Sequence, residues 1–330
     1  MVTWQVHHDW QSVTSLWDAL LALQPHRVFF QEHTVQKSWW ESNGQPPLQI
    51  VVVHEEDKPI GLFPLVQINE KLQLLGDQDV SDYLDFILLP GKEAPAFSAF
   101  SEFLLTNKAW SKLELVSLPE SSSTLTQLPQ LAAHQHWSTQ TTQQTVCPII
   151  ELPSSWDEYL SQVGKKQRHE IKRKWLRLEE QGSVNFRIVT DTNAQPDTLE
   201  TFFTLHQQSS VEKAAFWTPS HRSFFERLSA AASQGGWLRL YFLDFNGQPA
   251  AAMYCFDYDN QLLIYNSGFD ASAFADKSIG HVLTAYTIKD AIEQGKVKYD
   301  FLRGGEEYKM RYHPVAHPIF DLRVEKASDA

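Results

Sequence analysis

The segment 261–303 constrains the fold most strongly, because strand, loop, helix and strand follow one another in it without interruption. QLLIYNSGF is a β-rich run. A helix is predicted over 279–294, with apolar side chains at Ile279 and Val282 on one face and Gly295 just past its end. The strand VKYDFL follows at once. A helix between two such strands predicts a crossover that joins a parallel pair, so we expect an α/β protein.

Helices and β-rich runs alternate through the rest of the chain. Helices are expected over 10–24, 31–41, 95–107, 121–135, 155–181, 197–209 and 219–234. The strands between them include the similar hairpins IVVVHEEDKPIGLFPL and RLYFLDFNGQPAAAMY, and HPIFDLRV is expected as the last strand. Polar TQTTQQT at 139–145 is interpreted as the break between two domains, 1–150 and 151–330.

Composition narrows the class of protein. The formal net charge is −12, which argues against general binding to DNA or to an anionic membrane. Cys147 and Cys255 are the two cysteines, so neither a disulfide framework nor a cysteine-rich metal site is expected. The histidines show no ligand spacing, and we expect no metal. With no secretory signal and no apolar run long enough to span a bilayer, a cytoplasmic protein is expected.

The start of the 279–294 helix is a candidate anion site. The first turn of a helix leaves backbone N–H groups unpaired, and these suit a phosphate or pyrophosphate. Gly280 would let a diphosphate approach the backbone, and Lys277 and Ser278 could add contacts. A plain helix start with Ser278 as its cap explains the same residues, because one glycine is not a phosphate fingerprint.

The order of these motifs resembles the GNAT superfamily of acyl-coenzyme A transferases, most closely its cellulose-biosynthesis-type and Fem-like branch. The motifs are K-S-x-G, the helix, G-x-V-K-Y-D-F-L-R-G and E-x-Y-K, together with GLFPL, SDYLDF, the basic helix GKKQRHEIKRKWLRLEEQG and Leu205-His206. The resemblance implies two tandem GNAT-like domains, each a mixed, mostly antiparallel sheet flanked by helices. The first would be degenerate and serve the acceptor, and the second would bind the acyl donor.

The implied activity is N-acyl transfer, in the first place of acetyl, from acetyl-CoA or another acyl-CoA to an amine of a small molecule or sugar. The coenzyme would contact Lys277, Ser278, Ile279, Gly280 and His281. This loop keeps one glycine of the usual GNAT motif and has lysine where arginine or glutamine is expected. Fem-type relatives use aminoacyl-tRNA, so that donor stays open. A non-catalytic role, as a scaffold in polysaccharide synthesis, also stays open as an alternative to acyl transfer.

Transfer to an amine needs a proton acceptor for the amine and an acid for the leaving thiolate. Asp300, in a strand that reads as covered, is a candidate base. It could equally be a structural carboxylate held by a cation or by backbone N–H groups. Glu306 is an alternative base, although a loop glutamate is usually solvated. Tyr308 resembles the tyrosine that many GNAT enzymes place near the thiolate, and simple packing is its other interpretation.

The remaining candidates would bind substrate. Arg303 could clamp a carboxylate or phosphate, or pair with a neighbouring acid. Lys309 could meet the coenzyme phosphates or an oxyanion, or lie on the surface. Asp82 and Tyr83 could hold a cationic or sugar-like acceptor; the alternative is a turn capped by Ser81 and Asp82.

The basic helix is the strongest charge feature of this acidic chain. Lys172 and Arg173 lie at its centre, and the helix carries one apolar stripe. A solvated helix face is one interpretation. The other is an anion site for coenzyme phosphate, a phosphorylated carrier or tRNA.

Overall fold

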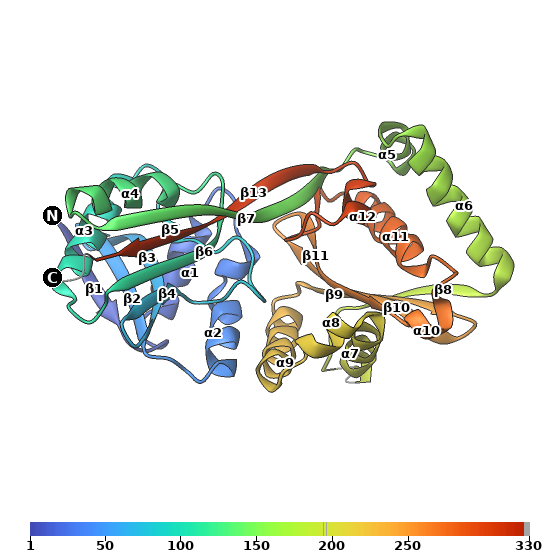
Figure 1. Cartoon of the computed structure of the whole chain (residues 1–330), viewed down its shortest axis with the longest axis horizontal. Coiled ribbons are helices and arrows are strands. Elements are labelled where there is room, and N and C mark those ends of the chain that lie inside the picture. The colour runs from blue at the N-terminus through green and yellow to red at the C-terminus, as the bar shows by residue number, and fades with distance from the viewer. Residues whose placement is uncertain (194, 196, 327–330) are drawn as a thin grey trace. The chain divides into compact units, whose positions relative to one another are not determined.

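The computed structural model describes residues 1–193, 195 and 197–326, and it confirms the predicted α/β fold of mixed sheets flanked by helices (Figure 1). The chain forms two compact units. Unit 1 contains residues 1–145 together with the chain from His317, and unit 2 contains residues 146–316. Within the described residues, no helix has both the length and the apolar character required to cross a bilayer.

Unit 1 is built around one mixed sheet. Its elements are β1 (Val2–His7), α1 (Thr14–Ala22), the 3-10 helix η1 (Phe29–Gln31), α2 (His33–Ser42), β2 (Leu48–Glu55), β3 (Lys58–Ile68), β4 (Lys71–Leu74), β5 (Ile87–Leu88), α3 (Glu93–Thr106), β6 (Lys112–Pro119), α4 (Thr124–His134), the first part of β7 (Ser138–Glu151) and most of β13 (Val315–Glu325). The strand order is β1-β2-β3-β4-β6-β13, and β5 pairs with β3. β4 and β6 run parallel, whereas β6 and β13 run antiparallel.

Aromatic side chains dominate the core of unit 1. Phe63 of β3 stacks on Phe100 of α3 with ring centroids 4.1 Å apart, and both rings are buried. Phe86 and Phe97 also pack against the ring of Phe63. Burial of several large rings on one helix–sheet interface is a major source of stability for a unit of this size.

Unit 2 carries the predicted crossover. Its elements are the last part of β7, α5 (Trp156–Gln162), α6 (Lys165–Gln181), β8 (Val184–Val189), α7 (Asp197–Ser209), α8 (Val211–Phe216), α9 (Pro219–Gln234), β9 (Leu238–Phe245), β10 (Gln248–Tyr258), β11 (Gln261–Phe269), α10 (Ala271–Phe274), α11 (Ile279–Glu293), β12 (Lys298–Asp300) and α12 (Glu307–Met310). The strand order is β7-β12-β11-β10-β9-β8. β11 and β12, which precede and follow α11 along the chain, pair in parallel. The other pairs of neighbouring strands in this unit are antiparallel.

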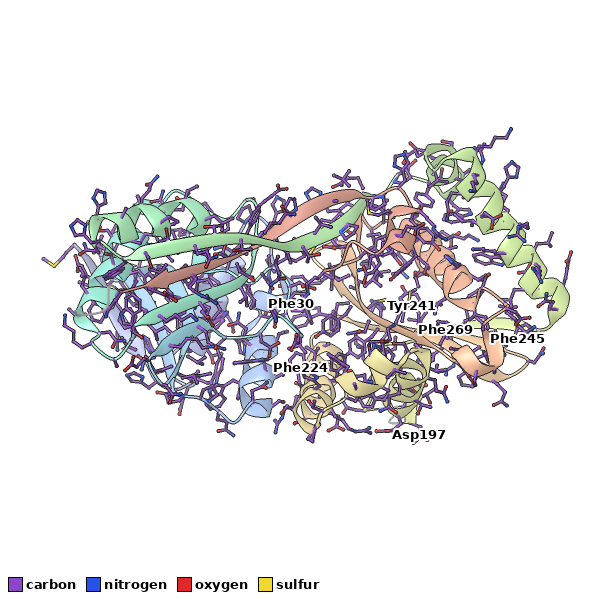
Figure 2. The ribbon with its side chains drawn as sticks, viewed as in Figure 1. Phe30, Asp197, Phe224, Tyr241, Phe245 and Phe269 are labelled. Carbon is purple, nitrogen blue, oxygen red and sulfur yellow. The ribbon has the colours of Figure 1, made fainter. Side chains whose placement is uncertain are left out.

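The sheet of unit 2 is covered on both faces. Tyr241, Phe245 and Phe269, labelled in Figure 2, belong to the core that β9, β10 and β11 form with α6 and α11. On the opposite face, Tyr254 of β10 contacts Phe202 of α7 and Phe225 of α9. Alternate residues of one strand therefore serve two separate cores, which is why these strands read as nearly continuous apolar runs.

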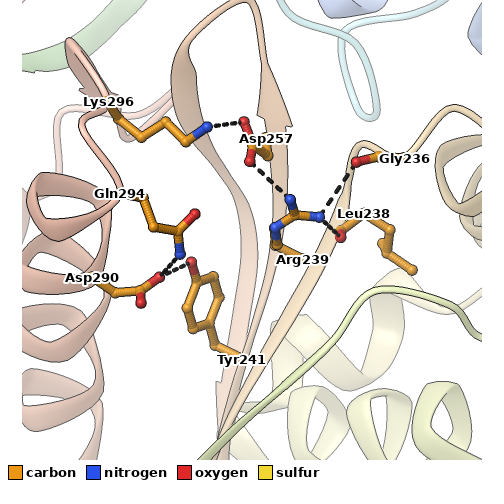
Figure 3. Close-up of polar contacts among 8 residues, drawn as sticks. All are labelled: Gly236, Leu238, Arg239, Tyr241, Asp257, Asp290, Gln294 and Lys296. Carbon is orange, nitrogen blue, oxygen red and sulfur yellow. Dashed lines mark hydrogen bonds and ion pairs between the residues drawn. The ribbon is translucent and has the colours of Figure 1, made fainter.

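Polar contacts fix the position of α11 on the sheet (Figure 3). The hydroxyl of Tyr241 on β9 donates to Asp290 of α11 at 2.7 Å. Nearby, Asp257 of β10 accepts from Arg239 at 2.9 Å and from Lys296, which follows the helix, at 2.5 Å. The C-terminal half of α11 is thus tied to two strands, which sets where its N-terminus lies.

Several local predictions were wrong. The expected helix over 155–181 is two helices, because Val163 and Gly164 adopt extended backbone angles between α5 and α6. TQTTQQT lies inside strand β7, which continues to Glu151, and its last residue, Thr145, is where the first stretch of unit 1 ends. HPIFDLRV is a strand as expected, but from His317 it packs with unit 1, where Leu322 pairs with Leu115 of β6.

Candidate functional site

A cavity of about 560 Å³ opens in unit 2 where β10, β11 and α11 meet. Its volume lies in the usual range for small-molecule sites. The lining includes sequence candidates from two separate motifs: Ser278, Ile279, Gly280, His281, Glu306 and Tyr308. Small or apolar side chains of β10, among them Ala251 and Met253, line another part of it. We therefore treat this cavity as the candidate active site.

The strand pairing explains why the sheet is open at this place. β11 pairs with β12 only through Gln261, Leu262 and Leu263, whereas its pairing with β10 continues to Phe269. The register with β10 also shifts between Tyr254 and Cys255, which marks a bulge. Bulges bend a strand and end regular pairing, and they are frequent beside active sites. The far half of β11 is thereby available to the cavity.

The N-terminus of α11 presents backbone donors. Ser278 has a left-handed φ of 56° and forms no side-chain cap, so the alternative that it caps the helix is wrong. Its carbonyl oxygen accepts from the N–H groups of His281 and Val282. For Ile279 and Gly280, no N–H partner is present in the described part of the chain. A Cβ added at Gly280 would meet nothing within 4 Å, so the space in front of these donors is open.

Lys277 does not line the cavity. Its Nζ donates to Gln181 Oε1 at 3.1 Å and lies 5.6 Å from the centre of the Phe245 ring. The side chain is therefore held by contacts with α6 and β9, whose residues do not line the cavity. A lysine at this position is close enough in sequence to the α11 N-terminus to add positive charge there.

Tyr308 belongs to the polar end of the cavity. Burial raises the pKa of its phenol, which keeps the hydroxyl protonated, and a hydrogen bond with the Ser267 side chain opposes this shift. A phenol that stays protonated at neutral pH can act as an acid. Glu306, 56% exposed in its side chain, lies at the same end and forms a 2.9 Å ion pair with Lys309.

Lys213 also lines this end of the cavity, and sequence reasoning missed it. Its Nζ donates to the main-chain oxygen of Ser267. Burial lowers the pKa of its amine, Glu306 raises it and Lys309 lowers it further. Lys213 sits on α8, a helix of 6 residues that is too short for periodicity to reveal.

The packing of α7 against β11 positions Lys213. A Cβ at Gly268 would come within 2.4 Å of the main-chain N and Cα of His206, so the backbones of helix and strand touch directly. Trp217 Nε1, which can only donate, bonds to His206 Nδ1 at 3.1 Å. His206 Nε2 therefore carries the proton and donates to Asn266 Oδ1 at 3.1 Å. Burial lowers the pKa of His206 to about 4, so it is neutral.

Asp300 lies off the cavity lining. It is 2% exposed, and its Oδ1 accepts a 2.7 Å hydrogen bond from the N–H of Leu302. Leu302 has a left-handed φ of 53°, which is unfavourable for a leucine. The carboxylate thus braces the turn that follows β12. Arg303 and Lys309 do not line the cavity either, and Lys309 Nζ donates to the main-chain oxygen of Arg303 at 2.7 Å.

Asp82 and Tyr83 belong to unit 1. Asp82 is buried, and Tyr83 has a left-handed φ of 53°. A second cavity, of about 440 Å³, lies beside β4, β6 and β13 of unit 1, and neither residue lines it. Its walls include Glu114, whose pKa is lowered to about 2 by hydrogen bonds and charges of Lys112 and Lys71 that outweigh its burial. These ionic groups therefore satisfy one another.

The basic helix is α6. Lys172 and Arg173 are both exposed, and Arg173 pairs with Glu170 at 2.8 Å. Neither residue lines the 560 Å³ cavity. Among the residues that the structure describes, no three His, Cys, Asp or Glu side chains gather as a metal site would require.

The sequence and the fold can be compared with those of known proteins. Residues 165–310 match the model of the acetyltransferase (GNAT) domain. The structure of FemX is similar over 96% of this chain and 96% of its own, with a TM-score of 0.63 and 11% identity. A tandem GNAT protein from the clavulanic acid biosynthesis pathway is similar over 100% of both chains, with a TM-score of 0.55 and 12% identity.

A third similar structure is the C-terminal domain of a putative lysylphosphatidylglycerol synthetase from Agrobacterium fabrum. It covers 97% of this chain and 93% of its own, with a TM-score of 0.58 and 10% identity. No curated protein matches the chain at a significant level. The chain thus has a GNAT, Fem-like fold, as the order of the motifs predicted, and residues 165–310 match the GNAT domain model.

Proposed function

We propose that unit 2 transfers an acyl group, in the first place acetyl, from coenzyme A to an amine of a small molecule or sugar. The observation that carries the proposal is the 560 Å³ cavity, in which the first residues of α11 and Tyr308 line the same space. The GNAT domain match covers every residue of this lining. A donor with a phosphorylated end and a reactive thioester needs both kinds of group.

The α11 N-terminus would bind the pyrophosphate of the coenzyme. The N–H groups of Ile279 and Gly280, which meet no acceptor among the described residues, and the positive end of the helix dipole suit an anion there. The absence of a side chain at Gly280 allows phosphate oxygens to approach the backbone. His281 lines the cavity at this end of the proposed site, whereas Lys277 is engaged with Gln181 outside the lining.

Tyr308 would protonate the sulfur that leaves. Breaking the thioester releases a thiolate, and the buried phenol, whose pKa is raised, holds a proton at neutral pH that it could donate. Asp300, the candidate base, is bonded to Leu302 and lies off the cavity, which favours its structural interpretation. Glu306 reaches the cavity but is already paired with Lys309. Asp82 and Tyr83 stay predictions for acceptor binding.

Isothermal titration calorimetry with acetyl-CoA tests the donor site. We expect binding by the wild type and loss of binding in Gly280→Asp, which places a carboxylate in front of the helix donors. Gly164→Asp is the matched control. Gly164 also begins a helix, and its Cβ would meet nothing within 4 Å, but it does not line the cavity. No heat with wild-type protein at millimolar acetyl-CoA would refute the proposal.

An aminoacyl-tRNA donor is the second candidate, and the exposed basic face of α6 favours it. Phosphate contacts by lysine and arginine make RNA binding strongly dependent on salt. The double variant Lys172→Ala/Arg173→Ala should then weaken tRNA binding and flatten its salt dependence. Unchanged filter binding of tRNA by this variant would leave α6 as a solvated face. Failure of both donors would favour the non-catalytic scaffold.

A further inference from the structure

We propose that Lys213 is the proton acceptor for the attacking amine, an inference that rests on the proposed acyl transfer in unit 2. The role is open because neither sequence candidate fits it. Asp300 is engaged with the Leu302 N–H away from the cavity, and Glu306 is ion-paired with Lys309. Lys213, on α8, lines the same cavity.

Ser267 places Lys213 next to Tyr308. The main-chain oxygen of Ser267 accepts from Lys213 Nζ, and its side chain is hydrogen-bonded to the Tyr308 hydroxyl. The two side chains therefore converge on one residue of β11. If Tyr308 delivers a proton to the leaving sulfur, Lys213 lies beside the carbon that the amine attacks. A base must be within hydrogen-bond reach of the proton it removes, and Lys213 lines the same cavity as Tyr308.

The hydrogen bonding of Nζ fits a neutral amine. An ammonium has three N–H groups to satisfy, whereas a neutral amine has two and keeps a lone pair. Within the described residues, the Ser267 oxygen is the acceptor that Nζ meets. Burial in this partly covered site disfavours the charged ammonium. A neutral amine leaves its lone pair for the cavity.

Several charged or titratable groups lie around the amine of Lys213. Glu306 faces Lys213 and favours the ammonium, but its carboxylate is shared with Lys309, which opposes it. His206 of α7 is neutral, and Tyr308 keeps its proton. Burial is the largest influence on Lys213 and also disfavours the charged form. Buried lysines act as bases for this reason.

The proposed step balances. The neutral amine attacks the thioester carbon, and a new N–C bond forms as the carbonyl becomes a tetrahedral oxyanion. The lone pair of Lys213 Nζ takes one proton from the attacking nitrogen. The C–S bond then breaks, and the electron pair leaves with sulfur, which takes the Tyr308 proton. The products are an amide and free coenzyme A, and the proton gained by Lys213 equals the one lost by Tyr308.

The structural anchoring of Lys213 supports this role. Gly268 allows the backbone of α7 to touch β11, and Ser209 at the end of α7 exchanges hydrogen bonds with the main chain of Phe269 at 2.8 and 3.2 Å. α8 begins two residues later, where Ser210 caps it by accepting from the Lys213 N–H. Two anchors thus fix the start of α8 before the lysine side chain enters the cavity.

The first test measures ionisation. Trace acetic anhydride labels neutral amines, and peptide mass spectrometry between pH 6 and 11 gives a labelling curve for each lysine. Lys213 should become reactive at lower pH than Lys289, which lies on α11 outside the cavity and serves as the internal reference. Coincident curves would overturn the proposal. This readout does not depend on coenzyme binding, so it separates failure of the inference from failure of the proposed function.

The second test measures catalysis. Hydroxylamine is a small amine that needs no acceptor pocket, and its reaction with acetyl-CoA releases a titratable thiol. Lys213→Met should lower the enzymatic rate by about 10²-fold or more with acetyl-CoA affinity unchanged. Lys213→Arg should be equally slow, because guanidinium cannot accept a proton. Full activity in either variant, or no acceleration by the wild type, would overturn the assignment. Lys289→Met is the control.

A third variant reconstructs the base. The two native cysteines, Cys147 and Cys255, are both buried, so Lys213→Cys can be alkylated selectively with 2-bromoethylamine. The product carries an amine at nearly the same reach. Recovery of thiol release after alkylation is expected, whereas Lys213→Cys that stays inactive while still binding acetyl-CoA would count against a base at this position.

Discussion

The direct contact between α7 and β11 leads to a prediction about two glycines of one cavity. Gly268→Ala places a Cβ within 2.4 Å of the main chain of His206. Ordinary carbon contacts are about 3.5 Å, so helix and strand must separate by about 1 Å. The obstacle is backbone, and no flexible side chain can move aside. We expect a loss of about 3 kcal/mol, the upper end of the usual range for overpacking.

Urea unfolding provides the measurement. With a denaturant slope of about 2 kcal/mol/M, that loss lowers the midpoint by about 1.5 M. Gly280→Ala is the matched variant, since the same added carbon meets nothing within 4 Å and the position is helical. It should leave stability unchanged or raise it by up to about 1 kcal/mol. Equal midpoints for Gly268→Ala and wild type, with unchanged hydrogen exchange in α7, would refute the described packing.

Four further predictions follow from single side chains. Because burial lowers the pKa of His206 to about 4, this imidazole takes up its proton at a higher pH in the unfolded chain than in the folded protein. The wild type should lose up to about 3 kcal/mol between pH 6.5 and 4, and His206→Gln should not, as urea titrations at several pH values will show. Burial instead raises the pKa of Asp85, so stability should fall as pH rises above about 4, and parallel pH curves for wild type and Asp85→Asn would contradict this. Tyr308→Phe should slow thiol release by about 10²-fold or more while calorimetry shows unchanged acetyl-CoA binding; a normal rate would remove the acid role. Asp300→Ala should cost about 1–2 kcal/mol in urea unfolding by leaving the Leu302 N–H unpaired, and loss of turnover at full stability would instead restore Asp300 as the base.

Much of the fold could be predicted because local signals agree with it. The apolar stripe of the 279–294 helix, Gly295 after it and the strands on both sides specify the crossover without tertiary information. The break at Gly164 could not be predicted in the same way. The helical pattern continues across it, and only the extended angles of Val163 and Gly164 separate α5 from α6.

Part of the candidate site could be predicted from the sequence. Ser278 to His281, Glu306 and Tyr308 fall in motifs whose order is informative, and the structure gathers them in one cavity. Lys213 comes from a distant short helix, so only the contact of α7 with Gly268 brings it there. Asp300 shows the opposite case. A carboxylate in a covered strand signals importance, but its hydrogen bond to Leu302 assigns that importance to a turn.

The route of β13 has a consequence for synthesis on the ribosome. The first unit needs β13 from His317 onward to pair with β6, yet all of residues 146–316 are translated before that strand. At typical elongation rates this delay is on the order of 10 to 30 s. During that time the edge of β6 that β13 will cover is exposed as an unpaired strand, which invites association with other nascent chains. The second unit, by contrast, is fully translated first, so the order of completion reverses the order of the sequence.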